Sequence, residues 1–346
     1  MTAKKIFNVK SGNMNVNELQ QQLFQAIKRK LQKEESVAEE IARLLEISTD
    51  SAYRRMRGEK TITFDELYAI ATNYNISLDQ LMNIHNGAIM FQGQYLDKNN
   101  FRFEEYMTSM LQNLAYMNSF KEKEFYYSCK DIPVFYHFVF REIAAFKWFF
   151  WLKTYFQFPE FERKKFRFSD YRDDLFAIDQ KVLNLYNQIP SVEIWNIESM
   201  SIIFRQIEFY RDSQVFESDR DVYILYEAVE KLWGHLEKQA AFGYKFTYGD
   251  PEEKPTGKFR MYFNEVLLGD NNMLAVLDGV KLSYIAHTTI NFMLTRDMVF
   301  NENMYNHLQN QMKRSTLISA VSEKERAKFF RIIRERIARR KEALNV

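Results

Sequence analysis

The sequence predicts a mainly α-helical protein with two parts: a small N-terminal helical bundle, and a larger, mostly helical α+β region with a small antiparallel sheet. Two observations lead to this fold class. Helix-start signals and apolar residues at helical spacing are concentrated in residues 17–84. Aromatic residues, in contrast, are concentrated after about residue 90, since only Phe7, Phe24 and Phe64 of the 31 Phe precede it, and none of the four Trp does. A chain of 346 residues can bury two such cores.

The domain boundaries follow from these patterns. Residues 1–16 have little periodicity and are interpreted as a flexible tail, and residues 17–84 as the bundle. Residues 85–100 contain turn-forming Asn and Gly and are interpreted as a linker. Residues 101–346 form the aromatic-rich region, in which the proline-containing stretch 250–258 is either a surface loop or a subdomain boundary.

Capping boxes mark the starts of helices in the bundle. In this motif a Ser or Thr side chain and a Glu or Gln three residues later satisfy backbone amides at the helix start. The pairs that fit are Ser36 with Glu39, Thr63 with Glu66, and Ser77 with Gln80. A further short helix is expected between Ile47 and Arg57, held in place by inward packing of Ala52 and Met56.

The aromatic region is predicted to contain both helices and strands. Helices are expected near 103–120, 134–156, 198–211 and 220–242, from 303 onward, and finally from Ser322 to the C-terminus. Strands are expected at 124–128, 259–268 and 273–287. Asp278-Gly279 is typical of a type I′ hairpin turn within the last of these.

Charge and cysteine content exclude several classes of protein. The formal net charge is +2, and residues 1–90 carry 12 Lys and Arg against 11 Asp and Glu, so any nucleic-acid contact must come from a local cluster. The single Cys129 cannot form an internal disulfide, which favours a reducing cytoplasm. The most apolar stretch, 132–158, is interrupted by charged residues, and each would cost about 2.5–3.5 kcal/mol at a bilayer centre. No membrane span or membrane partner is therefore expected.

Residues 17–84 resemble the Cro/C1-type helix-turn-helix family, also called the XRE or lambda-repressor-like family. The residues that carry the resemblance are Ala42, Ile47-Ser48, Arg57-Gly58 and the run Ile76-Ser77-Leu78-Asp79-Gln80-Leu81. Glu46 departs from the family pattern, which often has Gly at the tight turn, and predicts a less sharp turn. The resemblance implies a bacterial transcription regulator that binds a double-stranded DNA operator as a homodimer, because two half-sites multiply specificity.

The resemblance also assigns a DNA-reading surface between Ser48 and Lys60. The third helix of the family enters the major groove with its N-terminal residues against base edges. Ser48 is the expected N-cap, and the base-facing candidates are Thr49, Asp50, Tyr53 and Arg54. The expected phosphate contacts are Arg55, Arg57 and Lys60.

Other interpretations stay open at this stage. The basic run RRMRGEK is also compatible with a solvated helix face, and a helix-turn-helix can bind a protein partner instead of DNA. No phosphate-binding glycine motif and no HExxH motif is present, so no enzyme, no cofactor and no metal site is expected. His137, within the aromatic stretch, is interpreted as a hydrogen-bonded core residue.

Two features of the aromatic region suggest further partners. A cavity lined by Phe135, Phe138, Trp148 and Trp151, with Arg141 or Glu142 directed into it, would suit a small amphipathic effector, although aromatic stripes are usually core. The basic last helix could bind DNA backbone, acidic lipid or an acidic protein. Packing of that helix on its own domain or on a second subunit is the simpler interpretation.

Overall fold

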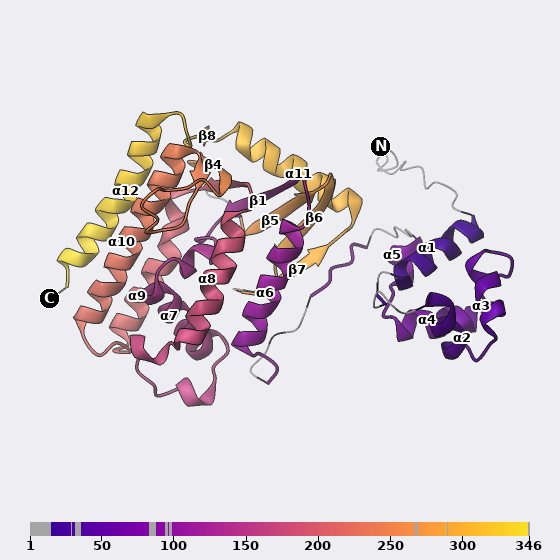
Figure 1. Cartoon of the computed structure of the whole chain (residues 1–346). Helices are drawn as coiled ribbons and strands as arrows, with labels where there is room; N and C mark the ends of the chain where they lie inside the picture. The colour runs from indigo at the N-terminus through magenta and orange to yellow at the C-terminus, as the bar shows by residue number, and fades with distance from the viewer. Residues whose placement is uncertain are drawn as a thin grey trace, which may run out of the picture. The chain divides into compact units, whose positions relative to one another are not determined.

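The chain forms two compact units, Met1–Ile89 and Met90–Val346. The structure, a computed structural model, describes residues 15–28, 30–31, 36–82, 88–93, 96, 99–266, 269–288 and 290–344. The predicted tail therefore lies almost entirely outside the described residues, as does much of the predicted linker. The mainly helical fold class is confirmed, with strands confined, in the described part of the chain, to the second unit (Figure 1).

The first unit is a bundle of short helices. They are α1 (Val16–Lys28), α2 (Val37–Leu44), α3 (Thr49–Met56), α4 (Phe64–Asn73) and α5 (Leu78–Met82). Their inward faces meet in a core of small and aliphatic side chains around one aromatic ring, namely Leu23, Phe24, Ile27, Val37, Ala38, Ile41, Ala42, Ala52 and Ile70. None of these helices is stable alone at such lengths, so packing of this shared core holds them.

Two of the predicted helix caps are resolved in detail. At α4, the Thr63 hydroxyl accepts from the Glu66 amide while the Glu66 carboxylate accepts from the Thr63 amide, so this capping box is confirmed. Ser36 precedes α2 as the N-cap but makes no side-chain cap hydrogen bond. At the C-terminal end of α4, the Lys30 ammonium donates to the carbonyls of Tyr74 and Asn75, where a cation is favoured by the helix dipole.

The second unit combines α-helices with a mixed sheet. Its α-helices are α6 (Phe103–Asn118), α7 (Arg141–Phe150), α8 (Asp173–Asn187), α9 (Ser201–Asp212), α10 (Asp219–Phe242), α11 (Met298–Lys313) and α12 (Glu323–Glu342). Its strands are β1 (Lys123–Cys129), β2 (Ser191–Trp195), β3 (Tyr244–Lys245), β4 (Gly257–Phe263), β5 (Asn272–Leu277), β6 (Val280–Ala286), β7 (Phe292–Thr295) and β8 (Thr316–Leu317). Short 3₁₀ or π turns are η1 (Val134–Phe138), η2 (Trp151–Tyr155), η3 (Pro159–Phe161), η4 (Phe168–Asp170) and η5 (Ile197–Met200).

The sheet is larger than the predicted antiparallel one and is mixed. Its order is β3-β4-β2-β1-β5-β6-β7, with β8 pairing β4; β1, β2 and β4 run parallel, and the other pairs are antiparallel. Asp278 and Gly279 both have positive φ, 44° and 84°, as a type I′ turn between β5 and β6 requires. The stretch 250–258 joins β3 to β4, which pair with each other, so it is a hairpin loop rather than a subdomain boundary.

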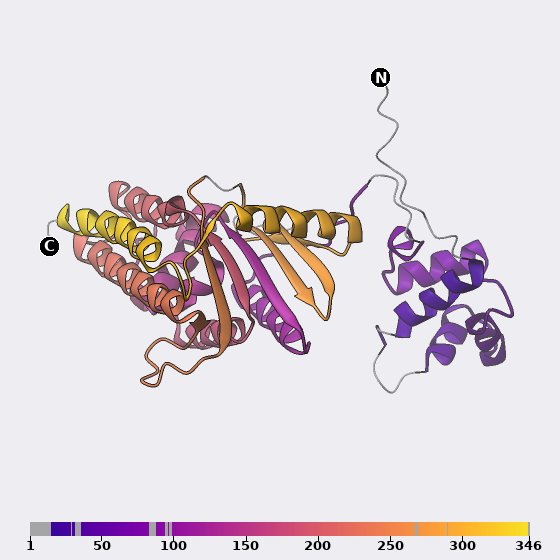
Figure 2. The same cartoon turned by 90° about the horizontal axis from the view of Figure 1, so that it is seen from above.

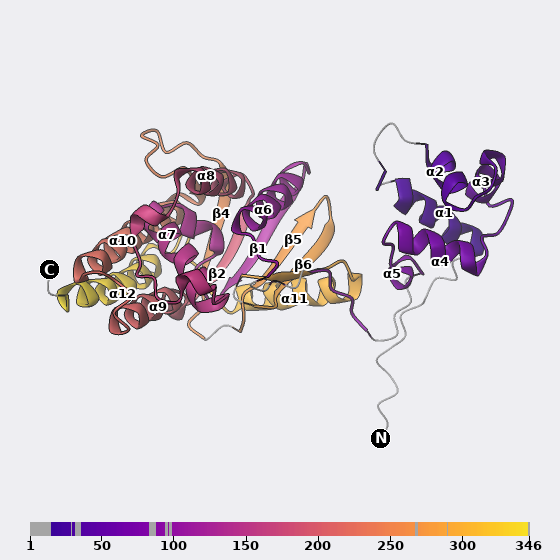
Figure 3. The same ribbon diagram turned by 90° about the horizontal axis from the view of Figure 1, so that it is seen from below.

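Helices cover both faces of this sheet. On one face, α11 packs Leu308 and Met312 against Tyr126, Ile194 and Leu274. The other helices of the unit share the large core of the opposite face. Figures 2 and 3 show the sheet between α11 on one side and α6 and α8 on the other. A strand buried on both sides has no polar face, which explains why each residue of β2 is buried.

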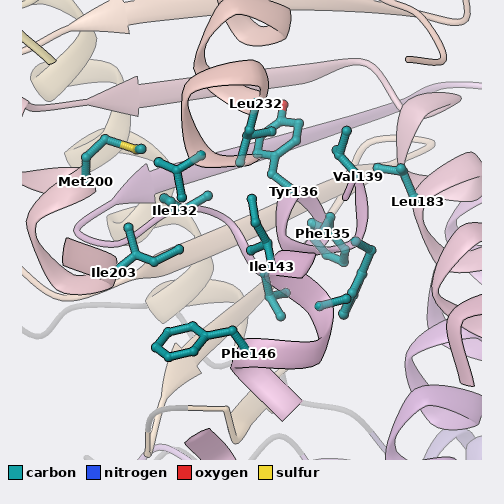
Figure 4. Packing of buried hydrophobic residues seen from close by; sticks show 14 of the residues in the cluster. Ile132, Phe135, Tyr136, Val139, Ile143, Phe146, Leu183, Met200, Ile203 and Leu232 are labelled. Carbon is teal, nitrogen blue, oxygen red and sulfur yellow. The ribbon is translucent and has the colours of Figure 1, made fainter. Parts of the chain in front are cut away.

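The helix predicted over 134–156 is interrupted. A 3₁₀ turn, η1, precedes α7, and a π turn, η2, follows it. Figure 4 shows Phe135 and Tyr136 of η1 packing beside Ile143 and Phe146 of α7 in the core. The irregular turns let aromatic side chains on several sides of the segment become buried, which one face of a regular helix could not do.

The last helix packs on its own unit. Phe329, Phe330, Ile333 and Ile337 are buried, and the Trp233 indole of α10 donates to the Phe330 carbonyl over 2.9 Å. Most of the basic residues pair with carboxylates of the same unit: Arg336 with Glu198, Arg340 with Glu208, Lys341 with Glu230, Arg334 with Glu237, Lys328 with Glu265, and Arg331 with Glu335. The structure therefore supports the simpler interpretation of this helix, packing on its own domain. Among the described residues, no helix combines the length and apolar character needed to cross a membrane.

Candidate nucleic-acid interface

The turn between α2 and α3 sets the orientation of the candidate reading helix. Glu46 adopts a left-handed backbone conformation, with φ of 53°, and the Ile47 amide donates to the Ala42 carbonyl over 3.0 Å. The turn thus has the geometry that Gly usually provides, and the predicted loss of sharpness at Glu46 is wrong. Ala52 is buried completely, so α3 lies close to α2 and can expose its opposite side.

The predicted base-facing residues share that exposed side. Thr49, Asp50, Tyr53 and Arg54 are all exposed, and their spacing of four residues places them on one face of α3. Ser48 begins the helix as predicted, because its hydroxyl accepts from the Ser51 amide over 3.2 Å. This face offers a hydrogen-bond acceptor, Asp50, and a donor, Arg54, one helical turn apart.

The end of α3 carries a small charge cluster on its surface. The Arg57 guanidinium donates to both carboxylate oxygens of Glu59, over 2.7 and 3.2 Å, and Arg54 lies 3.7 Å from the same carboxylate. The pKa of the Glu59 carboxyl is lowered by its hydrogen bond to Arg57, and that of Arg57 is raised. Lys60 is exposed beside them. Arg57 and Lys60 are thus accessible to a phosphate, although the Arg57 guanidinium is hydrogen-bonded to Glu59 in the free protein.

Arg55 does not have the phosphate-binding role expected from the sequence. Its side chain is only 3% exposed and forms two hydrogen bonds with Glu66, of 3.0 and 2.6 Å, and a third with the Ser51 carbonyl. The hydrogen bond from Arg55 lowers the pKa of the Glu66 carboxyl. Because Glu66 also caps α4, Arg55 ties α3 to α4 and cannot reach a phosphate without breaking a buried ion pair.

Sequence reasoning missed Gln20, which supports the loop after α3. This buried side chain of α1 donates to the carbonyls of Arg55 and Lys60, over 2.6 and 2.8 Å, and accepts from the Ile62 amide. Its hydrogen bonds hold the chain that carries Arg57 and Lys60. The signal was a single polar residue on the face of α1 that otherwise presents Leu23 and Ile27 to the core.

The residues predicted to line an aromatic cavity in the second unit do not surround one together in the part of the chain that the structure describes. Phe138 and Trp151 are packed in the core, and the buried charge nearby is Lys147 rather than Arg141 or Glu142, both half-buried. The Lys147 ammonium lies 3.7 Å from the Asp131 carboxylate and donates to Gln206, and burial lowers its pKa.

His137 is a core residue as expected, and burial holds its pKa well below the ordinary value. Neither of its ring nitrogens, however, has a hydrogen-bond partner within the described part of the chain. No group of three or more His, Cys, Asp or Glu side chains that could hold a metal ion occurs among the described residues.

Comparison with known proteins bears on the first unit and the first four residues of the second. No curated protein and no solved structure matches the chain. A family match begins at the first residue of α1, extends past α5 and ends at Gly93. Residues 16–93 match the model of the BetR domain, a helix-turn-helix DNA-binding domain family of regulators.

Proposed function

We propose that this protein is a sequence-specific transcription regulator that binds double-stranded DNA through α3. The observation that carries the proposal is the exposed face formed by Thr49, Asp50, Tyr53 and Arg54, in a unit whose residues match a DNA-binding domain family. The Cro/C1-type arrangement expected from the sequence supplies the orientation of α3 in the major groove. The proposed function includes no catalytic step. A DNA target implies that the protein acts in the cytoplasm.

Each residue of this surface has a distinct role in the proposal. Arg54 donates two hydrogen bonds to a guanine, and Asp50 accepts from a cytosine amino group. Tyr53, which is 44% exposed, adds an apolar contact with a polar end. Arg57 and Lys60 bind phosphates and fix the register of α3 without reading sequence.

The protein binds its operator as a homodimer in this proposal. One bundle with a single reading helix contacts few base pairs, and each base pair is worth only about 1–3 kcal/mol of discrimination. Two copies on half-sites one helical turn apart, about 10–10.5 base pairs, multiply the specificity. The second unit supplies the contacts between copies or responds to a signal, because its 27 Lys and Arg against 31 Asp and Glu in residues 91–315 do not favour DNA binding.

Selection of bound genomic fragments, followed by titration of the preferred site at two salt concentrations, tests the proposal. Arg54→Ala should weaken the preferred site by about 1–3 kcal/mol and relax the preference at one base pair per half-site. Lys60→Ala should weaken all sequences alike and lower the salt dependence. Arg163→Ala removes an exposed Arg from the second unit and should leave binding unchanged. A wild-type protein without sequence preference, or an Arg54→Ala variant identical to it, contradicts the proposal.

A second candidate function is binding of a protein partner by the helix-turn-helix. The observation that favours it is a pair of aromatic side chains one turn apart on α4, Phe64 and Tyr68, which are 82% and 68% exposed. Salt dependence separates the two candidates, because phosphate contacts make affinity fall steeply with salt. Binding that depends on Phe64 and changes little with salt favours the protein partner.

A further inference from the structure

A groove in the second unit runs along one side of α6. It encloses about 460 Å³ between α6 and the strands β5, β6 and β7. Small-molecule sites in proteins measure about 300–1,000 Å³ and are mostly apolar with a few polar groups. The volume and the shape of this groove fit that description. It is a different place from the aromatic cavity expected from the sequence, with which it shares Phe135 alone.

The wall formed by α6 is apolar inside and polar at its rim. Tyr106, Met110, Leu114 and Met117 line the groove at helical spacing, from half-buried to buried, while Ser109 and its exposed neighbours border the opening. The lining of α6, from Glu105 to Met117, extends over about three turns, roughly 18 Å at 1.5 Å per residue. The groove is therefore long and narrow, and an unbranched chain fits it better than a compact ring.

Two polar groups of the lining are available to a ligand. Arg102 donates through one terminal nitrogen to the carbonyls of Phe101 and Asn99, and no carboxylate among the described residues pairs with it. The Tyr284 side chain also lines the groove, and burial raises the pKa of its hydroxyl to about 12, so it stays a neutral donor. Glu105, on the rim, is the other charged residue of the lining.

The opposite wall includes the first residues of the second unit. Gln92 pairs with Leu294 of β7 through both backbone hydrogen bonds, of 2.7 and 2.8 Å, and the Thr295 hydroxyl donates to the Met90 carbonyl over 2.7 Å. A Cβ on Gly93 would lie 3.1 Å from the Met293 side chain, so this strip, residues 90–93, packs tightly against β7. The strip lines the groove and directly follows the first unit in the chain.

We propose that this groove binds an elongated amphipathic carboxylate, with its hydrocarbon chain along the apolar side of α6 and its head group at Arg102. The apolar length selects an unbranched chain, and Arg102 supplies a charge-assisted hydrogen bond to the carboxylate. A bound chain fills the space between α6 and the strip 90–93 and so holds the strip on β7. This last step rests on the proposed function: occupancy of the groove changes the affinity of the first unit for its operator, because the strip is covalently connected to that unit.

Calorimetric titration of the full-length protein with straight-chain carboxylic acids of increasing length, and with alcohols of matching length, tests the site. We expect affinity to rise with chain length up to the length of the groove, and the acid to bind better than the alcohol. Arg102→Gln should weaken binding of the acid by about tenfold or more and leave binding of the alcohol nearly unchanged. Glu105→Gln should strengthen binding of the acid, because it removes a negative charge near the bound carboxylate.

Variants that block the groove separate specific binding from general adsorption. Asn113→Trp places a large ring on the exposed rim, where folding tolerates it, and Met110→Trp fills the inside. Both should abolish binding of acid and alcohol, and Gln112→Trp, also exposed on α6 but outside the lining, should not. Absence of binding by any chain length, or equal binding to the Asn113→Trp variant, overturns the proposal.

DNA titrations with and without the acid then test the regulatory step separately. The acid should shift operator affinity of the wild-type protein and leave that of Asn113→Trp unshifted. Arg54→Ala should weaken binding to the operator, relax the preference at one base pair per half-site, and keep the affinity for the acid. If the protein binds acid but shows no operator preference, the proposed function fails and the site stands; if it binds the operator but no acid, the reverse holds.

Discussion

At the scale of single residues, Glu59 competes with DNA for the basic side chains at the end of α3. It holds Arg57 by two hydrogen bonds and lies 3.7 Å from Arg54. Each contact must be given up when these side chains bind DNA, and a carboxylate close to phosphates is repelled. We therefore predict that Glu59→Gln strengthens binding to operator and nonspecific DNA alike, by about twofold to tenfold at low salt.

Fluorescence anisotropy with operator and scrambled duplexes measures this change. The gain should shrink as salt increases, because exposed charges are screened. Glu160→Gln, which removes an exposed carboxylate from the second unit, is the charge-matched control and should leave the affinity unchanged. Unchanged or weaker DNA binding by Glu59→Gln would show that Glu59 positions Arg57 for DNA rather than competing for it.

Glu46 stores backbone strain that a substitution can release. A side chain in the left-handed region costs about 1–2 kcal/mol, whereas Gly adopts it freely but loses about 0.5–1 kcal/mol of chain entropy. We predict that Glu46→Gly stabilises the first unit by about 0.5–1 kcal/mol. Hydrogen exchange of α2 and α3 amides in the full-length protein measures it. Glu46→Ala keeps the Cβ and should give no such gain; an equal gain would assign the effect to loss of the charge.

Sequence patterns located the exposed residues of α3 but not the roles of the buried polar ones. Ser48, Tyr53 and Arg54 were predictable because capping and helical spacing depend on neighbours in the sequence. Arg55 was misassigned because its partner, Glu66, lies on another helix, and the pairing depends on how α3 and α4 pack. Gln20 was missed for the same reason, since it holds backbone groups 35 to 42 residues away.

At the scale of elements, the ion pair between α3 and α4 makes the first unit sensitive to acid. The folded protein holds the pKa of Glu66 below its ordinary value of 4.5, so the folded state binds fewer protons there than the unfolded state. This part of the stability is present above pH 4.5 and is lost as the pH falls below it. We predict that Glu66→Gln destabilises the first unit by about 2–3 kcal/mol at neutral pH and flattens its acid dependence.

Chemical denaturation of the full-length protein between about pH 3 and pH 7 measures this dependence. The transition of the first unit can be followed through hydrogen exchange of α3 and α4. Asp65→Asn changes the neighbouring exposed carboxylate of α4 and should keep most of the wild-type slope of unfolding free energy against pH. If Glu66→Gln retains the whole slope, other carboxylates account for the acid sensitivity.

Local signals also explain which elements of the second unit were predictable. The hairpin at Asp278-Gly279 was found because turn residues mark it, and the strand over 124–128 because aromatic residues, which favour strands, are concentrated there. Strand β2 was missed because Glu193 interrupts a short apolar run. That carboxylate is buried and accepts hydrogen bonds from four groups that come together only in the folded protein. They are the hydroxyls of Tyr136, Tyr186 and Ser191 and the indole of Trp195.

At the scale of the whole molecule, part of the stretch predicted as a linker belongs to the second unit. Residues 85–100 were expected to connect the domains, yet residues 90–93 are part of the second unit, because Gln92 extends the sheet beside β7. Asn and Gly in this stretch indicated turns, whereas backbone pairing with a strand some two hundred residues later left no local signal. The match to the BetR domain also ends at Gly93, within this strip.

In the proposed regulation, release of the strip is the change by which the second unit acts on the first, and Thr295 offers a way to alter it. Thr295→Val keeps the shape of a buried side chain in β7 and removes its hydrogen bond to Met90, together with the one that its hydroxyl accepts from the Asp297 amide. One such bond contributes about 0.5–1.5 kcal/mol, so the Gln92 amide should exchange about 3–10 times faster. Tyr284, on β6, should exchange as in the wild type, because the sheet itself is unchanged. If Gln92 exchanges no faster, its own pairing with Leu294 is sufficient to hold the strip, and control by the groove must act through another contact.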